Sequence, residues 1–282
     1  MKTRKSTIFV ISILAIAVIC VGGYSVYKSS RYQKEAVPEA VDASELANEV
    51  NPEESRAEAI TSSQATGEAE SPASVGSSIE PALPAELNLK MTFYPQAPFG
   101  NWDLPWQETC EEASVLLVAN EYFHHDWTAE QFNDELLKLV EWEKTTFGDY
   151  KHTNDNQTAK ILNDYLGLKT VIHENPTFED VQKVIAKGHF IVMTFAGKHL
   201  GNPFYKNGGP NYHAMVIKGY EEGEKIITSD VGTKRGENYV YSWATLDNAL
   251  HDYAEPIEDG AKRMIEVIPP DVTTQEVIPP AT

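Results

Sequence analysis

The amino-acid sequence predicts an α+β fold for residues 89–268, and three observations support it. Helical patterns with start and stop signals fill the first half of this stretch. Apolar runs with the spacing of β-strands fill the second half, and a loop containing Gly223 joins two of these runs as a hairpin. Helices followed by an antiparallel sheet are typical of this class. We therefore expect N-terminal helices, with a buried central helix, packed on an antiparallel sheet.

The helices come first along the chain. Glu112 follows Thr109 in the pattern of a capping box, so a helix should begin at Cys110. The residues from there to Ala119 are apolar on nearly every face, which predicts that this helix is buried. Three more helices are expected at residues 128–144, 156–165 and 177–187.

The strands follow. Apolar runs predict five of them, at residues 189–195, 212–220, 225–230, 239–241 and 263–268. The second and third should pair as the hairpin around Gly223. Between the last two strands, residues 243–251 predict one more helix.

The net charge of −19 is spread unevenly, and this divides the chain into segments. Residues 1–34 hold six bases and no acid, whereas residues 35–88 hold twelve acids and one base. Four segments are predicted: an N-terminal membrane anchor at 1–34, a disordered acidic linker at 35–88, the folded domain at 89–268 and a disordered tail at 269–282.

The anchor is predicted from an apolar run. Between Lys5 and Lys28 lie 22 residues without charge, enough to cross a hydrocarbon core of about 30 Å as a helix. This run is longer than that of a cleaved signal peptide, and no good cleavage site follows it. We expect an uncleaved signal-anchor in the cell membrane, with the C-terminal domain outside the cytoplasm. Secretion after signal cleavage is the alternative.

Composition excludes several classes of protein. The acidic balance leaves no basic surface for nucleic acid. Two cysteines, Cys20 and Cys110, are too few for a disulfide framework or for a zinc site built from cysteines. No cofactor and no metal are predicted, and the sequence leaves the oligomeric state open.

Three residues suggest nucleophilic chemistry. Cys110 is predicted in the first turn of a helix, where exposed N–H groups and the helix dipole favour a thiolate. His213 lies near the start of a predicted strand, and Asp230 ends the next strand. If these strands form a hairpin, Asp230 can orient His213, and His213 can accept the thiol proton. The alternatives are a core cysteine, a core histidine and an aspartate in a turn.

This order of residues resembles the papain-like cysteine peptidases. More narrowly, it resembles cysteine peptidase family 39, the double-glycine leader peptidases of bacteriocin exporters and their stand-alone relatives. Four stretches carry the resemblance: Phe93-Tyr94-Pro95-Gln96-Ala97-Pro98, Cys110-Glu111-Glu112-Ala113-Ser114, Tyr212-His213-Ala214-Met215-Val216 and Ser229-Asp230-Val231-Gly232. The resemblance covers residues 89–268 and implies a papain-like fold and a peptide or protein substrate.

The resemblance also implies a role for each residue. Cys110 would be the nucleophile, His213 the general base and acid, and Asp230 the residue that orients His213. A glutamine upstream of the cysteine would donate to the oxyanion; Gln96 is preferred, because a loop can fold back beside the cysteine, and Gln107 is the rival. Many members have glycine after the cysteine, where this chain has Glu111.

That departure bears on the thiol pKa. A negative charge at Glu111 opposes ionisation of Cys110. We expect the neighbouring glutamates to point to solvent, so that a protonated His213 outweighs them and lowers the pKa of the thiol.

Other candidates are weaker. His124-His125-Asp126 and the pair His152 and Asp155 could be metal ligands, but surface positions are expected for them. Of the tryptophans near the cysteine, some could line a substrate cleft and at least half should belong to the core; they are Trp102, Trp106, Trp127 and Trp142. Residues 204–210 predict a flap or a simple turn ahead of His213.

Three functions compete at this stage. The first is a membrane-tethered thiol peptidase acting outside the cell. A Cys-His-Asp set also serves transglutaminase-like enzymes and amidases that act on wall peptides, which gives the second. A binding module without catalytic activity on the same fold is the third.

Overall fold

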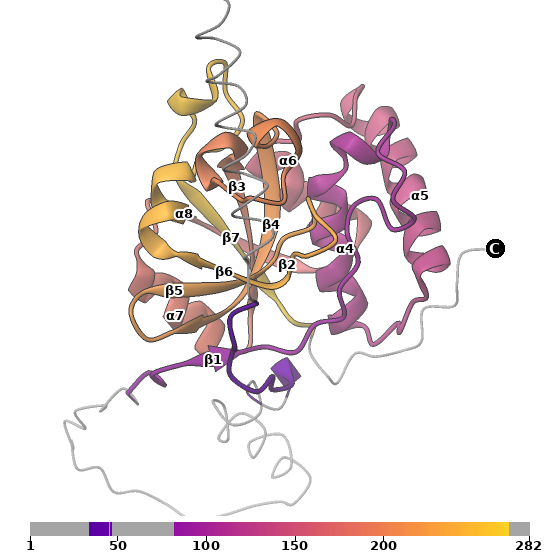
Figure 1. Ribbon diagram of the computed structural model, residues 1–282. Coiled ribbons are helices and arrows are strands. Elements are labelled where there is room, and N and C mark those ends of the chain that lie inside the picture. Colours follow the sequence, from indigo (N-terminus) through magenta and orange to yellow (C-terminus); the bar gives the residue numbers. More distant parts are fainter. Residues whose placement is uncertain (1–33, 45, 47–81, 271–282) are drawn as a thin grey trace, which may run out of the picture.

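The computed structural model describes residues 34–44, 46 and 82–270, whose main part is an α+β fold (Figure 1). A seven-stranded antiparallel sheet has the strand order β2-β7-β3-β4-β5-β6, with β1 paired to β4. The strands are β1 (Leu87–Asn88), β2 (Lys169–Glu174), β3 (Phe190–Ala196), β4 (Tyr212–Glu221), β5 (Lys225–Ser229), β6 (Glu237–Ser242) and β7 (Arg263–Ile268).

The helices lie on both sides of the central strands. In Figure 1, α4 and α5 are to the right of β3 and β4, and α7 and α8 are to the left. Their bounds are α4 (Cys110–Tyr122), α5 (Ala129–Phe147), α6 (Asp155–Lys160), the π-helix η2 (Ile161–Tyr165), α7 (Phe178–Ala186) and α8 (Trp243–Ala249). Short 3-10 helices are η1 (Trp106–Glu108), η3 (Gly197–Leu200), η4 (Lys206–Gly208) and η5 (Ile257–Asp259).

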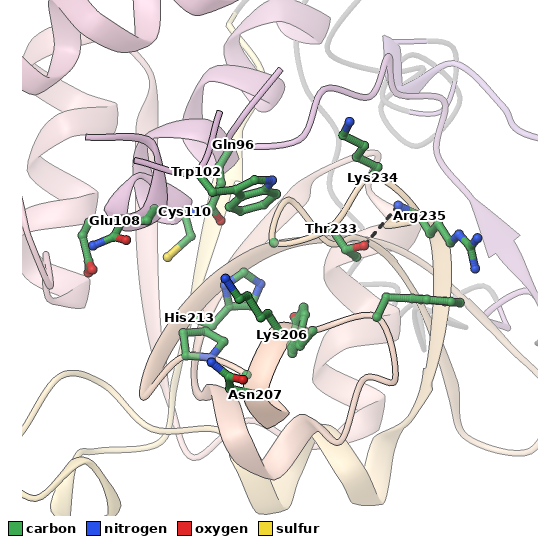
Figure 2. A pocket seen from close by; sticks show the side chains of 16 residues that line it. Gln96, Trp102, Glu108, Cys110, Lys206, Asn207, His213, Thr233, Lys234 and Arg235 are labelled. Atoms are coloured by element: carbon green, nitrogen blue, oxygen red, sulfur yellow. Dashed lines mark hydrogen bonds between the residues drawn. The ribbon is translucent and has the colours of Figure 1, made fainter. Parts of the chain in front are cut away.

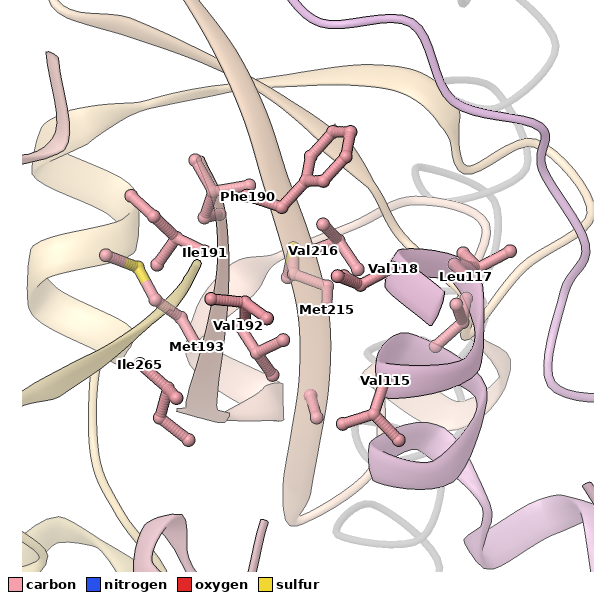
Figure 3. Packing of buried hydrophobic residues seen from close by; sticks show 14 of the residues in the cluster. Val115, Leu117, Val118, Phe190, Ile191, Val192, Met193, Met215, Val216 and Ile265 are labelled. Carbon is pink, nitrogen blue, oxygen red and sulfur yellow. The ribbon is translucent and has the colours of Figure 1, made fainter. Parts of the chain in front are cut away.

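The core forms where α4 meets the sheet. All seven residues of β3 are buried. Since side chains alternate along a strand, burial on both faces requires a continuous apolar run. Figure 3 shows Ile191 and Met193 on the side away from α4, while Val115 and Val118 of α4 lie toward Val216 of β4. The helix that carries Cys110 is therefore held between the sheet and α5.

Most predicted elements are present. The helix beginning at Cys110 is confirmed, and so are the four longer predicted strands to within one or two residues. Strand β2 was not predicted, because its residues alternate between exposed and half-buried positions at the sheet edge and lack a strong apolar run. The predicted capping box at Thr109 is wrong. The Thr109 hydroxyl donates instead to the carbonyl of Trp106, at 3.2 Å.

The folded part begins earlier than residue 89. Leu87 and Asn88 pair with β4, and Val41 forms a parallel bridge with Leu89. Ala43 is buried in the core cluster. A short piece of the segment assigned to the linker, which includes Val41 and Ala43, therefore packs against the folded domain.

The predicted anchor and tail lie outside the described residues, apart from Lys34 and from Pro269 and Pro270. Among the residues that the structure describes, no helix has the length and apolar character needed to cross a membrane.

Candidate active site

Cys110 begins α4 and lies at the edge of the core. Its side chain is 6% exposed, and among the described residues it forms no disulfide. Helix α4 packs closely against β4, where the backbone of Ala214 acts to lower the pKa of the Cys110 thiol. The first turn of α4 is thus pressed against the strand that also carries His213.

His213 and Asp230 face one another from neighbouring strands. His213 lies near the start of β4, and Asp230 directly follows β5. The pairing of Val216 with Ser229 brings these ends together, and His213 Nε2 lies 2.9 Å from Asp230 Oδ1. Both side chains are almost fully buried. The structure therefore brings together the histidine and the aspartate that the sequence predicted to be close.

Asp230 is held by four further donors. Oδ2 accepts from Asn202 Nδ2 at 2.9 Å and from the hydroxyls of Tyr205 and Tyr241 at 2.7 Å each. Oδ1 also accepts from the backbone N–H of Gly232 at 3.1 Å. A buried carboxylate with this many partners has a fixed orientation, which it passes on to the imidazole.

These contacts also fix the charge of Asp230. Burial would raise the pKa of its carboxyl, but hydrogen bonds from His213, Tyr205 and Tyr241 outweigh burial and keep the pKa below its ordinary value. Asp230 is therefore ionised at neutral pH, and its partner nitrogen on His213, Nε2, carries the proton. The other ring nitrogen, Nδ1, is left to accept one.

Glu111 does not point to solvent, so the expectation for the thiol is wrong. Its side chain is 1% exposed, and the Cys110 thiol donates to Glu111 Oε2 at 2.9 Å. Burial, followed by the charge and the hydrogen bond of Glu111, raises the pKa of Cys110 well above its ordinary value. The cysteine in this arrangement is a neutral thiol bound to a carboxylate.

The carboxyl of Glu111 is itself perturbed. Burial raises its pKa to about 7, although the hydrogen bond from Cys110 opposes the rise. Two more acids lie behind it. Burial and the charge of Glu143 raise the pKa of Glu112, and burial raises the pKa of Glu143 on α5 to about 8. The buried carboxyl groups of Glu111, Glu112 and Glu143 are therefore largely protonated, and so uncharged, below neutral pH.

Cys110 and His213 open into one pocket of about 670 Å³. Figure 2 shows the sulfur of Cys110 directed toward the side on which His213 lies. Both candidate glutamines, Gln96 and Gln107, line this pocket. Gln96 is buried, and its Nε2 donates to the carbonyl of Trp106 at 2.8 Å, which leaves one N–H of the amide for another acceptor.

The tryptophans and histidines that were weaker candidates for the site occupy different parts of the structure. Trp102 lines the pocket, whereas Trp106, Trp127 and Trp142 pack against the core. His125 stacks on Trp127, and His152 stacks on Tyr253. Within the described part of the chain, no group of three or more His, Cys, Asp or Glu side chains could hold a metal ion.

The sequence analysis missed the residues that surround Asp230. Asn202 precedes the loop expected to be a flap or turn, Tyr205 lies within that loop, and Tyr241 lies on β6. One signal was present. Tyr239 and Tyr241 lie two residues apart on β6, so their side chains are on the same face of the sheet. Strand β6 pairs with β5, which Asp230 directly follows, so tyrosine hydroxyls could be expected near this aspartate. No pattern in the sequence pointed to Asn202.

The chain matches the family model described as "Peptidase_C39 like family" over residues 88–255. Among solved structures, it is similar to a C39-like peptidase from Bacillus anthracis, with 16% sequence identity and a TM-score of 0.39, over 63% of this chain and 94% of that one. No curated protein matches the chain.

The match extends over more than half of the chain and includes Gln96, Cys110, His213 and Asp230. The observed helices and antiparallel sheet are those expected for a papain-like fold, as predicted. On this evidence the chain belongs to the Peptidase_C39-like family.

Proposed function

We propose that this protein is a membrane-tethered cysteine peptidase that hydrolyses peptide bonds outside the cytoplasm. One observation carries the proposal. Cys110 lines the same pocket as His213, and a buried aspartate, Asp230, holds the far nitrogen of that histidine at 2.9 Å. A nucleophile, a base and an orienting carboxylate in this order are the set that acyl transfer requires.

The reaction begins when the thiol turns from Glu111 toward His213. The proton of Cys110 passes to Nδ1 of His213, and the sulfur attacks the substrate carbonyl carbon, so that an S–C bond forms and the carbonyl oxygen becomes an oxyanion. The backbone N–H of Cys110 and the remaining N–H of Gln96 donate to this oxyanion. Asp230 stabilises the imidazolium that forms.

Two steps complete the cycle. Collapse of the oxyanion breaks the peptide C–N bond, and the imidazolium gives its proton to the departing amine. Water then attacks the thioester while His213 accepts a proton from it. The S–C bond breaks, the acid product leaves, and the proton on His213 returns to the sulfur of Cys110.

The tether rests on the sequence. The uncharged run between Lys5 and Lys28 supports a membrane helix, and its residues lie outside those that the structure describes. We expect the full-length protein to stay with membranes after carbonate extraction. A mature N-terminus found beyond Tyr24 by sequencing would replace the anchor with a cleaved signal.

Activity is tested with the full-length protein on a randomised peptide library and on purified wall fragments, with products identified by mass spectrometry. Cys110→Ala should lower peptide cleavage by about 10³-fold or more, and His213→Ala by nearly as much, because nucleophile and base act as one unit. His199→Ala, at an exposed histidine that does not line this pocket, is the matched control. Circular dichroism shows whether each variant is folded.

The outcomes separate the three candidate functions. Undiminished cleavage by Cys110→Ala would contradict the assignment of the nucleophile. Release of products from wall fragments alone would favour an amidase instead. A wild-type protein that leaves both substrates intact would favour a binding module.

A further inference from the structure

The rim of the pocket carries positive charge in an acidic molecule. Residues 89–282 contain thirty acids and sixteen bases. Yet Lys206, Lys234 and Arg235 line the pocket together with a single acid, Glu108. All three cations are exposed, and among the described residues none of them has an ion-pair partner within 4.0 Å.

These cations come from two loops that meet at the rim. Lys206 begins η4, ahead of β4, and Lys234 and Arg235 lie in the turn between β5 and β6. The guanidinium of Arg235 lies over the ring of Phe204, 4.6 Å from its centre, which joins the two loops. A cation–π contact leaves the N–H groups at the edge of the guanidinium able to donate.

A third loop closes the same side. The amine of Lys234 lies over Gly100, so close that a Cβ there would be 2.8 Å from Nζ. Trp102, two residues further along, also lines the pocket and is 39% exposed. Aromatic surface from Trp102 and Phe204 therefore lies beside the cations.

The charge is asymmetric across the pocket. In Figure 2, Glu108 lies beside Cys110 at one end, and Lys234 and Arg235 lie at the other. A substrate that crosses the sulfur thus meets negative charge on one side and positive charge on the other. Such a field favours one orientation of a charged chain and raises the local concentration of ligands of the matching sign.

We infer that the pocket selects peptides with carboxylate groups on one side of the bond that is cleaved. This inference rests on the proposed function and specifies its substrate class. Arg235 and the two lysines bind the carboxylates, while Trp102 and Phe204 contact neighbouring apolar side chains. The excess of acid elsewhere on the domain repels such peptides, so the rim is the one part of the lining where they gain by binding.

The test uses internally quenched peptides with blocked termini, all built on one fixed neutral frame from the library; a frame that the wild type cleaves is used where the library contains one. Two adjacent positions are Glu-Glu, Gln-Gln or Lys-Lys, placed on either side of the cut. We expect kcat/KM to be about tenfold higher for Glu than for Lys on one side only, and the difference to shrink in 0.5 M NaCl. A Gln peptide with a free C-terminal carboxylate tests whether a terminal carboxylate serves as well as a side chain.

Charge reversal supplies the matched pair of variants. Lys234→Glu/Arg235→Glu should abolish or invert the preference, whereas Lys151→Glu, an exposed lysine that does not line the pocket, should leave it unchanged. Equal cleavage of Glu, Gln and Lys peptides by the wild type would overturn the inference, and so would a preference that survives the double reversal.

A binding measurement separates this inference from the proposed function. The same peptides, labelled with a neutral dye, are titrated against full-length Cys110→Ala protein and followed by fluorescence anisotropy. Tighter binding of the Glu peptides without cleavage by the wild type would support the inference and contradict the peptidase. Cleavage without any dependence on charge would support the peptidase and contradict the inference.

Discussion

The contact between Cys110 and Glu111 decides how reactive the thiol is at rest. A carboxylate that accepts from a buried thiol favours the protonated sulfur. The helix start, which favours a thiolate, is opposed here by burial and by a charge at 2.9 Å. The enzyme we propose therefore keeps its nucleophile protonated until the sulfur turns to His213.

Replacing that charge should activate the thiol. In a Cys20→Ala background, which leaves one cysteine, Glu111→Gln should raise the rate of iodoacetamide labelling several-fold at pH 8. At that pH Glu111, with a pKa of about 7, is mostly ionised and opposes the thiolate. Below pH 6 the wild type has a protonated Glu111, so the two rates should converge. The measurement is the labelling rate from pH 5 to 9.

Glu108→Gln is the control for this change, because Glu108 lines the same pocket but is partly exposed, where water and salt screen its charge. It should alter the rate less than Glu111→Gln. A slower rate of labelling in Glu111→Gln would mean that Glu111 acts as a base toward the thiol and that its charge does not oppose ionisation of Cys110.

At this scale the sequence predicted which residues meet but not how they are protonated. The approach of His213 to Asp230 follows from a hairpin, which is a local pattern. The approach of Cys110 to His213 depends on the packing of α4 against β4, and before the structure it was implied by the family resemblance. The burial of Glu111 depends on how closely α4 packs against β4, which no local pattern contains. The identity of the oxyanion donor, Gln96 or Gln107, stays a prediction.

Among the elements, the turn between β5 and β6 has the most consequences for the site. It carries Asp230 at one end and the rim cations Lys234 and Arg235 near the other. The turn is closed by a hydrogen bond from the backbone N–H of Asp230 to the carbonyl of Gly236, at 3.0 Å. A Cβ on Gly236 would lie 1.7 Å from the carbonyl oxygen of Asp230.

Gly236→Ala should therefore move Asp230. We expect it to lower the free energy of unfolding by about 1–3 kcal/mol, as overpacking does, and to reduce kcat of the folded protein because the imidazole loses its fixed partner. Gly260→Ala is the matched control, since a Cβ there would also strike a carbonyl oxygen, that of Asp252, at 1.9 Å in a loop away from the pocket.

Urea titrations and peptide cleavage separate the two effects. Both variants should be less stable, but only Gly236→Ala should lose kcat once the folded fraction is equal. Equal kcat in the two variants would show that the β5–β6 turn does not need its present conformation to orient His213.

Predicting elements worked where the pattern was local and strong. The helix expected at residues 128–144 forms as α5, with Thr128 as its N-cap, and β3, β4 and β5 follow their apolar runs. Failures occurred where tertiary packing decided the outcome. Strand β2 pairs with β7 although the paired residues lie 89 to 99 positions apart in the chain, and β1 depends on a close approach to β4. Neither contact has a local sequence signal.

Over the whole molecule, the distribution of charge sets the response to pH. Several buried acids have raised pKa values in the folded state: Glu111 and Asp155 at about 7, and Glu143 at about 8, each mainly through burial. The pKa of Glu266 on β7 is shifted in the opposite direction. Burial would raise its pKa, but hydrogen bonds from His189 and His173 lower it to about 2.

The directions of these pKa shifts predict that the free energy of unfolding is greatest at mildly acid pH. A carboxyl with a raised pKa contributes stability that is complete below its unfolded pKa, about 4, and is lost as pH rises through 7–8. Glu266 contributes stability that is complete above its unfolded pKa and is lost as pH falls toward 2. The free energy of unfolding should therefore peak near pH 4–5 and fall by at least ~2 kcal/mol by pH 8.

Urea titrations at pH 3, 4.5, 6 and 8 measure this pH dependence of the free energy of unfolding. One variant tests the loss of stability above pH 6, and a second variant is its control. Glu143→Gln removes a buried titrating group while keeping a side-chain oxygen for the Thr153 hydroxyl, which donates to Glu143 at 3.0 Å. Its free energy of unfolding should fall less than that of the wild type between pH 6 and 8. Glu141→Gln, an exposed acid on the same helix, should follow the wild type. A wild-type optimum at pH 7 or above would mean that the buried carboxyls beneath Cys110 stay ionised in the folded protein.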